Sequence, residues 1–92
     1  MRYAERIEKK LTEGLAPTRL AVIDESHKHA GHGGAHPEGE SHFRVEVVSD
    51  AFNGQSRVAR QRAVYALLAE ELAERVHALQ LKTLTPDEDA AA

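Results

Sequence analysis

Cysteine is absent from this chain of 92 residues, and so are long apolar runs and any excess of positive charge. Without cysteine the chain can form no disulfide bond, and it can hold no iron–sulfur cluster through thiolates of its own. No segment approaches the roughly 20 apolar residues that a membrane-spanning helix needs. The formal net charge of −3 provides no global positive field that would attract nucleic acid or membranes. We therefore expect one globular domain of ordinary composition.

Signals for catalysis and for export are also missing. The sequence has no phosphate-binding glycine motif, and none of its serines lies in a pattern that would activate it as a nucleophile. The opening segment, MRYAERIEKK, contains no apolar stretch that resembles a secretory signal. We therefore expect a cytoplasmic protein that is not an enzyme and that has no membrane partner.

Histidine, by contrast, is abundant, with six residues in the chain. Neutral imidazole is the commonest metal ligand in proteins. A glycine-rich segment with several imidazoles can bind zinc, copper, nickel or iron, so one hypothesis is a metal buffer formed by that segment alone. The competing interpretation is a solvated, disordered loop. His77 stands apart, and the other five histidines lie between Asp24 and Phe43: His27, His29, His32, His36 and His42.

These histidines are not equivalent. For His32 and His36 the solvated loop is the favoured interpretation. His42 directly precedes an alternating segment and is predicted to be structural, either packing beside the next residue or capping the loop. His77 shares strand parity with the apolar residues that follow it, so a core or edge histidine is the alternative to a metal ligand. His27 has no assigned role.

The first half of the chain predicts a helix and two strands. Apolar residues recur every four positions over 2–13, which indicates a helix, and Gly14 is expected to end it. The segment 18–23 is short, apolar and partly β-branched, which indicates a strand. The segment 43–48 alternates, with Phe43, Val45 and Val47 on one face and charged residues on the other, which indicates a second strand. The connection from about 24 to 42 is far longer than the roughly 2–5 residues of an ordinary hairpin loop. It is therefore expected to be functional or disordered.

The second half opens with a turn, which could include a short helical turn near 54–57. Ser56 is a candidate N-cap for the helix that follows. One apolar stripe runs along 57–76, which predicts a single long helix. On this helix Glu71 and Arg75 are expected to form an i,i+4 ion pair on the solvated side.

A third strand and a short helix should complete the chain. Residues 77–84 alternate in polarity, which indicates the strand. Thr85, Pro86 and Glu88 have the spacing of a capping box with proline at the first helical position. The helix that begins there should last a turn or two, before a disordered tail at about 89–92.

The predicted element order is α-β-β-α-β-α. The first two strands should be antiparallel, whereas the long helix acts as a right-handed crossover that makes the second and third strands parallel. We therefore predict an α+β fold, in which helices pack on one face of a three-stranded mixed sheet. No internal repeat or second domain is visible.

Specific strings in this sequence resemble a known family. They are SHFRVEVVSD at 41–50, YALLAEEL at 65–72 and VHAL at 76–79. Together they closely resemble the BolA family, and the similarity covers nearly the whole chain, from about 7 to 88. The resemblance implies a class II KH-like fold in a single BolA-like domain over 1–92, in agreement with the element order above.

The resemblance also implies a function, as a partner of CGFS-type monothiol glutaredoxins in iron–sulfur cluster trafficking or iron regulation. In that family the heterodimer shares a [2Fe–2S] cluster, and the glutaredoxin and its glutathione supply the thiolates. His77 matches the regular histidine ligand, and His29 is the best match for a second ligand from the loop. The segment GHGGAHP replaces a Val-Pro-rich segment of relatives, so His32 and His36 stay open as second ligands. The isolated chain, a monomer or weak dimer, is expected to bind no cofactor tightly.

Some members of the family are DNA-binding transcription regulators, which implies an alternative function. Arg57, Arg60 and Arg62 cluster where the long helix is predicted to begin, although the helix macrodipole disfavours cations there. This accumulation indicates a nearby anion, either a nucleic-acid phosphate or a carboxylate of a partner protein. The alternative is that acidic neighbours such as Asp50 neutralise the arginines. Gly54 stands alone, so no GxxG motif supports nucleic-acid binding. DNA therefore ranks second as a partner.

Overall fold

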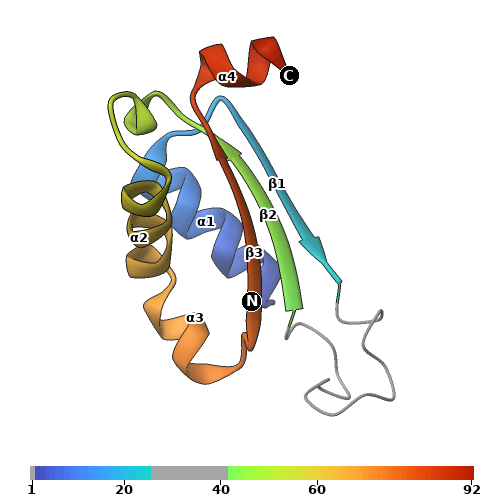
Figure 1. The fold of residues 1–92 in the computed structure, drawn as a ribbon. Coiled ribbons are helices and arrows are strands. Elements are labelled where there is room, and N and C mark those ends of the chain that lie inside the picture. Colours follow the sequence, from blue (N-terminus) through green and yellow to red (C-terminus); the bar gives the residue numbers. More distant parts are fainter. Residues whose placement is uncertain (1, 26–41) are drawn as a thin grey trace.

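The computed structural model describes residues 2–25 and 42–92, and Figure 1 shows how their helices and strands are arranged. Residues 1 and 26–41 lie outside the described part. The element order agrees with the sequence, apart from a short 3-10 helix and a break in the long helix. The elements are α1 (Tyr3–Leu15), β1 (Arg19–Asp24), β2 (His42–Val48), the 3-10 helix η2 (Asp50–Phe52), α2 (Arg57–Leu67), α3 (Ala69–Glu74), β3 (Ala78–Leu84) and α4 (Pro86–Ala91).

The three strands form one mixed sheet in the order β1-β2-β3. β1 runs antiparallel to β2, and Val22 lies opposite Val45. β3 runs parallel to β2, and Leu81 lies opposite the same Val45. Both strand directions predicted from the sequence are therefore confirmed. α2 and α3 form the crossover that makes β2 and β3 parallel.

Side chains alternate between the two faces of the sheet. Phe43, Val45 and Val47 of β2 are buried on the face that α1 and α2 cover (Figure 1). On the other face, the charged side chains of Arg44 and Glu46 pair with each other at 3.8 Å. The apolar stripes of the helices meet the same sheet face, so they share one core with the strands. The buried core consists of Ile7, Leu11, Leu15, Phe43, Val45, Val47, Phe52, Val64, Leu68 and Val76.

α1 continues beyond Gly14 and is followed by Ala16, not by the glycine. Ala16 adopts the left-handed conformation, with φ 45° and ψ 57°, and its N–H donates to the Thr12 carbonyl oxygen at 3.1 Å. Gly14 instead faces α2, where an added Cβ would lie 2.7 Å from Cδ1 of Leu67. The prediction that Gly14 ends the helix is therefore wrong. The glycine allows α1 and α2 to approach closely.

The single helix predicted over 57–76 is divided into α2 and α3. The break is at Leu68, whose φ of −105° and ψ of 18° depart from helical values. The Leu68 N–H still donates to the Val64 carbonyl oxygen at 3.1 Å, and the Leu72 N–H donates to that of Leu68 at 3.0 Å. The chain therefore changes direction while these main-chain hydrogen bonds are kept.

The turn before α2 is held by two serine side chains. The short helical turn expected near 54–57 forms earlier, as η2, and Oγ of Ser49 accepts a hydrogen bond from the Ala51 N–H at 3.0 Å. Oγ of Ser56 accepts from the Ala59 N–H at 3.1 Å, which confirms the predicted N-cap.

α4 begins with the predicted capping box. Oγ1 of Thr85 accepts from the Glu88 N–H at 3.2 Å, and Oε1 of Glu88 accepts from the Thr85 N–H at 2.8 Å. The tail predicted to be disordered at about 89–92 is helical as far as Ala91, and Asp89 pairs with Arg19 at 2.8 Å. None of the described helices is long and apolar enough to cross a membrane.

Candidate functional site at the histidine end of the sheet

One end of the sheet brings two histidines together. β1 ends at this point, whereas β2 and β3 begin there, and the Glu25 N–H donates to the His42 carbonyl oxygen at 2.8 Å. His77 directly precedes β3, and its ring centroid is 6.3 Å from that of His42, with the ring planes inclined by 54°. We call Glu25, His42 and His77 the histidine end of the sheet. It gathers imidazole nitrogens from the starts of two neighbouring strands.

His77 is exposed, whereas His42 is half-buried. Strand parity would place His77 with the inward-facing Leu79, as a core histidine. The structure does not support a core position, because β3 begins one residue later and leaves the ring of His77 outside the core. His77 therefore has the access that a ligand shared with a second protein requires.

The remaining histidines, His27, His29, His32 and His36, lie outside the described residues, and what the sequence predicts for them stays a prediction. Their segment follows Glu25 and returns to the described chain at His42, so it is attached at the histidine end on both sides. An extended chain spans at most about 3.6 Å per residue. His29 follows Glu25 by four positions, so covalent geometry keeps these residues within roughly 14 Å of each other.

The described residues do not build a complete metal site by themselves. Within 2–25 and 42–92, no group of three or more histidine, cysteine, aspartate or glutamate side chains could hold a metal ion. A [2Fe–2S] cluster is ordinarily held by thiolates, and imidazole is a known replacement for them. The exposed imidazole of His77 fits that role. The thiolates would have to come from another molecule, since the chain has no cysteine.

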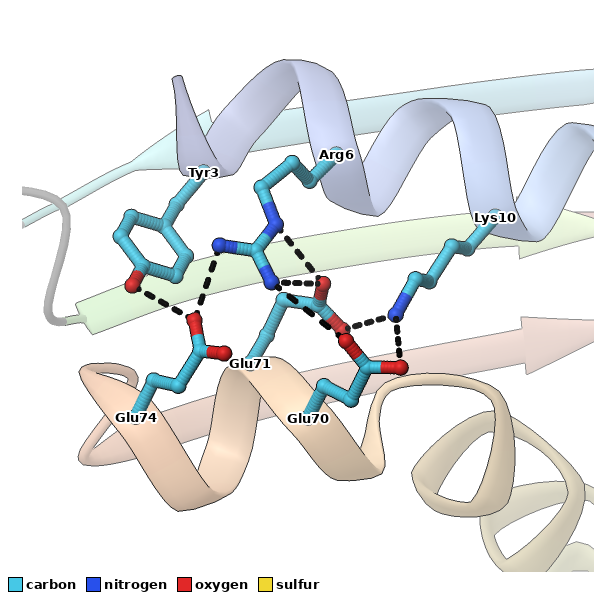
Figure 2. Close-up of polar contacts among 6 residues, drawn as sticks. All are labelled: Tyr3, Arg6, Lys10, Glu70, Glu71 and Glu74. Carbon is cyan, nitrogen blue, oxygen red and sulfur yellow. Dashed lines mark hydrogen bonds and ion pairs between the residues drawn. The ribbon is translucent and has the colours of Figure 1, made fainter. Parts of the chain in front are cut away.

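The helix that leads to His77 is fastened to α1 by a buried carboxylate, that of Glu71 (Figure 2). Oε2 of Glu71 accepts hydrogen bonds from Nε and Nη2 of Arg6 at 2.9 and 2.8 Å, and Oε1 accepts from Nζ of Lys10 at 2.9 Å. Burial alone would raise the pKa of Glu71, but the hydrogen bond from Lys10 and the nearby positive charges outweigh it and lower the pKa. The prediction that Glu71 lies on the solvated side is wrong, because its side chain is buried and faces α1.

The same cluster includes the last residue of α3, Glu74. Oε1 of Glu74 accepts hydrogen bonds from Nη1 of Arg6 and from the hydroxyl of Tyr3, both at 2.9 Å (Figure 2). These two donors lower the pKa of Glu74. The Arg6 guanidinium also lies 4.5 Å from the centre of the Tyr3 ring, within the range of a cation–π contact. α1 therefore holds α3 through two carboxylates, those of Glu71 and Glu74.

The main chain of Glu71 extends this support toward the histidine end. Its carbonyl oxygen accepts hydrogen bonds from the N–H groups of Arg75 and Val76, both at 3.0 Å. Val76 is buried in the core and directly precedes His77. The ionic cluster therefore helps to fix the backbone from which the His77 side chain projects.

The sequence contains a signal that Glu71 is buried. The i,i+4 spacing of Glu71 and Arg75 pointed instead to a solvated ion pair. Glu71 follows Val64 by seven positions and Leu68 by three, so it lies on the apolar stripe of the predicted helix. A carboxylate on such a stripe requires positive partners on the element that packs against it. Arg6 and Lys10, spaced four residues apart on α1, are those partners.

The arginines at the start of α2 do not form one surface. Arg60 is buried, and its Nη1 donates to the Thr83 carbonyl oxygen at 3.1 Å and to Oε1 of Glu88 at 2.7 Å. Its Nε donates to the Gln55 carbonyl oxygen at 3.0 Å. The hydrogen bond from Arg60 is the main reason that the pKa of Glu88 is lowered to about 2. The structure assigns Arg60 to packing between α2, β3 and α4, and not to a phosphate.

Two of the predicted DNA-binding arginines are accessible. Arg57 and Arg62 are exposed, and Gly54 has a φ of 78° in a turn where an added Cβ would meet nothing within 4 Å. The carboxylate that neutralises Arg60 is that of Glu88, not that of Asp50 as the sequence suggested. Of the residues predicted for DNA binding, only Arg57, Arg62 and the turn at Gly54 are therefore accessible to a nucleic acid.

Comparison with known proteins identifies relatives of similar length. A family model described as BolA-like protein matches residues 11–88. An uncharacterized protein in the cobS 5′ region of Sinorhizobium sp. is 53% identical over 89 residues, which cover 96% of each chain. The DNA-binding transcriptional regulator BolA of Escherichia coli (strain K12) is 47% identical over 85 residues, covering 92% of this chain and 77% of that protein.

Solved structures of relatives share the fold. The BolA domain of SufE1 from Arabidopsis thaliana matches with a TM-score of 0.83 at 46% identity, covering 92% of this chain and 93% of that one. BolA1 from the same plant matches with a TM-score of 0.84 at 40% identity, covering 96% of each chain. The chain spans only 24% of the whole SufE-like protein 1, so it resembles one part of that protein. The mixed α+β fold predicted from the sequence is confirmed.

Proposed function

This chain belongs to the BolA family, and we propose that it is a non-enzymatic partner of a monothiol glutaredoxin that contributes imidazole ligands to a shared [2Fe–2S] cluster. The observation that carries the proposal is the exposed His77 at the histidine end, with the ring of His42 6.3 Å away. Because the chain has no cysteine, thiolates from glutaredoxin and glutathione complete the ligand set. A cluster shared in this way serves iron–sulfur trafficking or iron regulation.

His77 is the first ligand in this proposal, and the second comes from the segment 26–41. His29 is the preferred second ligand, since it follows Glu25 by four positions and that residue bonds to His42 at the histidine end. His32 and His36 are the alternatives. His42 retains a structural role as the first residue of β2.

The chemistry of imidazole gives the shared site two properties. When bound, a [2Fe–2S] cluster supplies one-electron redox chemistry, and its potential is higher with imidazole in place of thiolate. His77 can act as a ligand only while its ring is neutral, so protons compete with the metal and acid weakens the assembly.

Anaerobic reconstitution with a CGFS-type monothiol glutaredoxin and glutathione tests the proposal, with visible circular dichroism as the readout. The natural sequence should give a spectrum that differs from that of glutaredoxin alone. His77→Ala should lose this difference, whereas His42→Ala, the matched control, should keep it. The assignment of His77 is wrong if its alanine variant gives the same spectrum as the natural sequence.

The same reconstitution identifies the second ligand. His29→Ala, His32→Ala and His36→Ala are compared one at a time. We expect His29→Ala to change the heterodimer spectrum and the other two variants to leave it unchanged. A change confined to His32→Ala or His36→Ala would transfer the assignment to that residue.

DNA binding as a transcription regulator is the second candidate function, and the name of the Escherichia coli relative favours it. Arg57 and Arg62 are exposed near the Gly54 turn and could contact phosphates. They neutralise at most about two phosphates, so the logarithm of the binding constant should fall with the logarithm of salt concentration with a slope near −2. Binding to duplex DNA across a salt series measures this slope. Absence of binding at low salt removes the candidate.

A further inference from the structure

A groove lies between α2 and β3, toward the end of β3 that is farthest from His77. Its volume is about 180 Å³. Small-molecule pockets usually measure roughly 300–1,000 Å³, so this groove suits one or two side chains of a peptide better than a free metabolite. We call it the β3 groove. Its lining residues are Arg57, Gln61, Leu81, Lys82, Thr83 and Leu84.

The β3 groove carries positive charge without a matching carboxylate. Arg57 and Lys82 are exposed, and no acidic residue lines the groove. Lys82 contributes to the lowered pKa of Asp89, but the Asp89 carboxylate is held by an arginine of β1 at 2.8 Å. Glu88 is likewise held by the buried arginine of α2 at 2.7 Å. Within the part of the chain that the structure describes, Arg57 and Lys82 therefore remain available to an external anion.

Among the described residues β3 is an edge strand, because β2 is its neighbour on one side and the three-stranded sheet ends on the other. The Leu84 carbonyl oxygen accepts from the Ser49 N–H on the β2 side, whereas the Thr83 carbonyl oxygen accepts from Nη1 of Arg60 on the free side. Main-chain groups alternate between the two sides of a strand, so Leu81 presents its N–H and carbonyl to the free side, as Thr83 does. An extended segment can pair with such an edge.

The adjoining surface of α2 has the composition of a binding face. Val58 and Tyr65 are the exposed large apolar residues of the described chain, with exposed fractions of 55% and 42%. Their spacing of seven residues places them on one side of α2, together with Arg62. Tyrosine and arginine are enriched among the residues that dominate binding energy at protein interfaces.

We propose that the β3 groove binds an acidic, extended segment of a partner protein, which adds to the edge of β3 and places carboxylates against Arg57 and Lys82. Main-chain hydrogen bonds to β3 supply affinity, and the two cations select for acidic sequence. Lys82 also disfavours pairing with β3 of a second copy, because a lysine on an edge strand opposes like-charged and apolar strands. Nucleic acid fits less well, because the groove offers two cations beside the apolar Val58.

The β3 groove is separate from the proposed cluster ligands. β3 begins at Ala78, next to His77, and ends at Leu84 in the groove. With a rise of about 3.3 Å per residue, the two ends of the strand are roughly 20 Å apart. Peptide binding therefore does not depend on the assignment of His77.

Titration of the full chain with a blocked peptide of alternating glutamate and valine residues tests the proposal, with two-dimensional amide NMR as the readout. We expect shifted amide resonances over 79–84 and at Arg57 and Gln61. Replacing both cations, Arg57→Gln with Lys82→Gln, should weaken binding about fivefold, the sum of two exposed ion pairs. Lys9→Gln is the control, because Lys9 is exposed on α1 and does not line the groove, and it should leave the affinity unchanged.

A second peptide separates strand addition from simple charge attraction. The same sequence with alternate main-chain nitrogens methylated keeps every carboxylate but cannot pair along a strand, so it should not bind. Equal binding of this peptide overturns the proposal. It is also overturned if single-stranded or duplex DNA shifts the groove resonances and the acidic peptide does not. His77→Ala should bind the peptide as the natural chain does.

Discussion

The two ends of the sheet differ in whether their key polar side chain is exposed or is buried and hydrogen-bonded within the chain. At the histidine end, His77 is exposed beside His42. At the other end, Arg60 is buried and donates to two main-chain oxygens and a carboxylate. The polar atoms of Arg60 are thus bound within the chain, whereas the exposed ring of His77 is open to another molecule. A candidate binding residue is therefore better recognised by polar atoms that remain accessible in the folded chain. The number of similar residues near it in the sequence is a poorer guide.

The largest effect should come from breaking the ionic cluster that supports the histidine end. Arg6→Met leaves the buried Glu71 carboxylate with Lys10 alone, so we expect a loss of about 3 kcal/mol in the free energy of unfolding. Urea unfolding followed by far-ultraviolet circular dichroism measures it. Glu70→Gln is the control, because the Glu70 side chain is 74% exposed and its ion pairs are as long as 3.8 and 4.0 Å. Equal losses in the two variants would contradict the structural role of the cluster.

A smaller loss is expected at the opposite end of the sheet. Arg60→Met keeps much of the packing but leaves the buried Thr83 carbonyl without its donor, so we expect a loss of about 2 kcal/mol. Arg62→Met should change the stability by less than about 0.5 kcal/mol, because that side chain is exposed. The assignment of Arg60 to packing fails if both variants unfold at the same urea concentration.

Acid should lower the stability that the ion pair between Arg60 and Glu88 contributes. The hydrogen bond from Arg60 lowers the pKa of Glu88 from 4.5 to about 2. A carboxyl group whose pKa is lowered on folding stabilises the folded state fully above its unfolded pKa. That contribution should therefore be lost as the pH falls from 4.5 toward 2. The difference in urea midpoint between the natural chain and Glu88→Gln should be large at neutral pH and should shrink over this range. A constant difference would contradict the ion pair.

The smallest effect on stability is expected for the residue that matters most for function. His77 is exposed, so His77→Ala should change the free energy of unfolding by less than about 0.5 kcal/mol. Thermal and urea unfolding of the isolated chain measure this change. A loss as large as that of Arg60→Met would show that His77 has a structural role, and the contrast between the two ends of the sheet would disappear.

Features that depend on local chemistry were predicted correctly from the sequence. Alternation over 43–48 gave the inward face of β2, and the spacing of Ser56 and of Thr85 with Glu88 gave two helix caps. Such features follow from residues close to one another in the chain. The strand directions also followed, because a helical crossover constrains them.

Features that depend on distant partners were missed. The burial of Glu71 requires Arg6 and Lys10 on a helix more than 60 positions earlier, and that of Arg60 requires acceptors on β3 and α4. The break at Leu68 gives no local proline or glycine signal. Charge spacing along one helix therefore placed Glu71 in solvent and left Arg60 with a phosphate or an unidentified carboxylate. Both predictions missed the intramolecular partners, because tertiary packing outweighs local pattern.

Pulsed electron paramagnetic resonance tests the central claim most directly, namely that His77 is a ligand of the shared cluster. The heterodimer is assembled with isotopically labelled histidine in this chain alone, and its cluster is then reduced by one electron. We predict a hyperfine coupling from imidazole nitrogen of this chain, reduced in His77→Ala and unchanged in His42→Ala. A coupling that is identical in the natural chain and in His77→Ala would contradict the account.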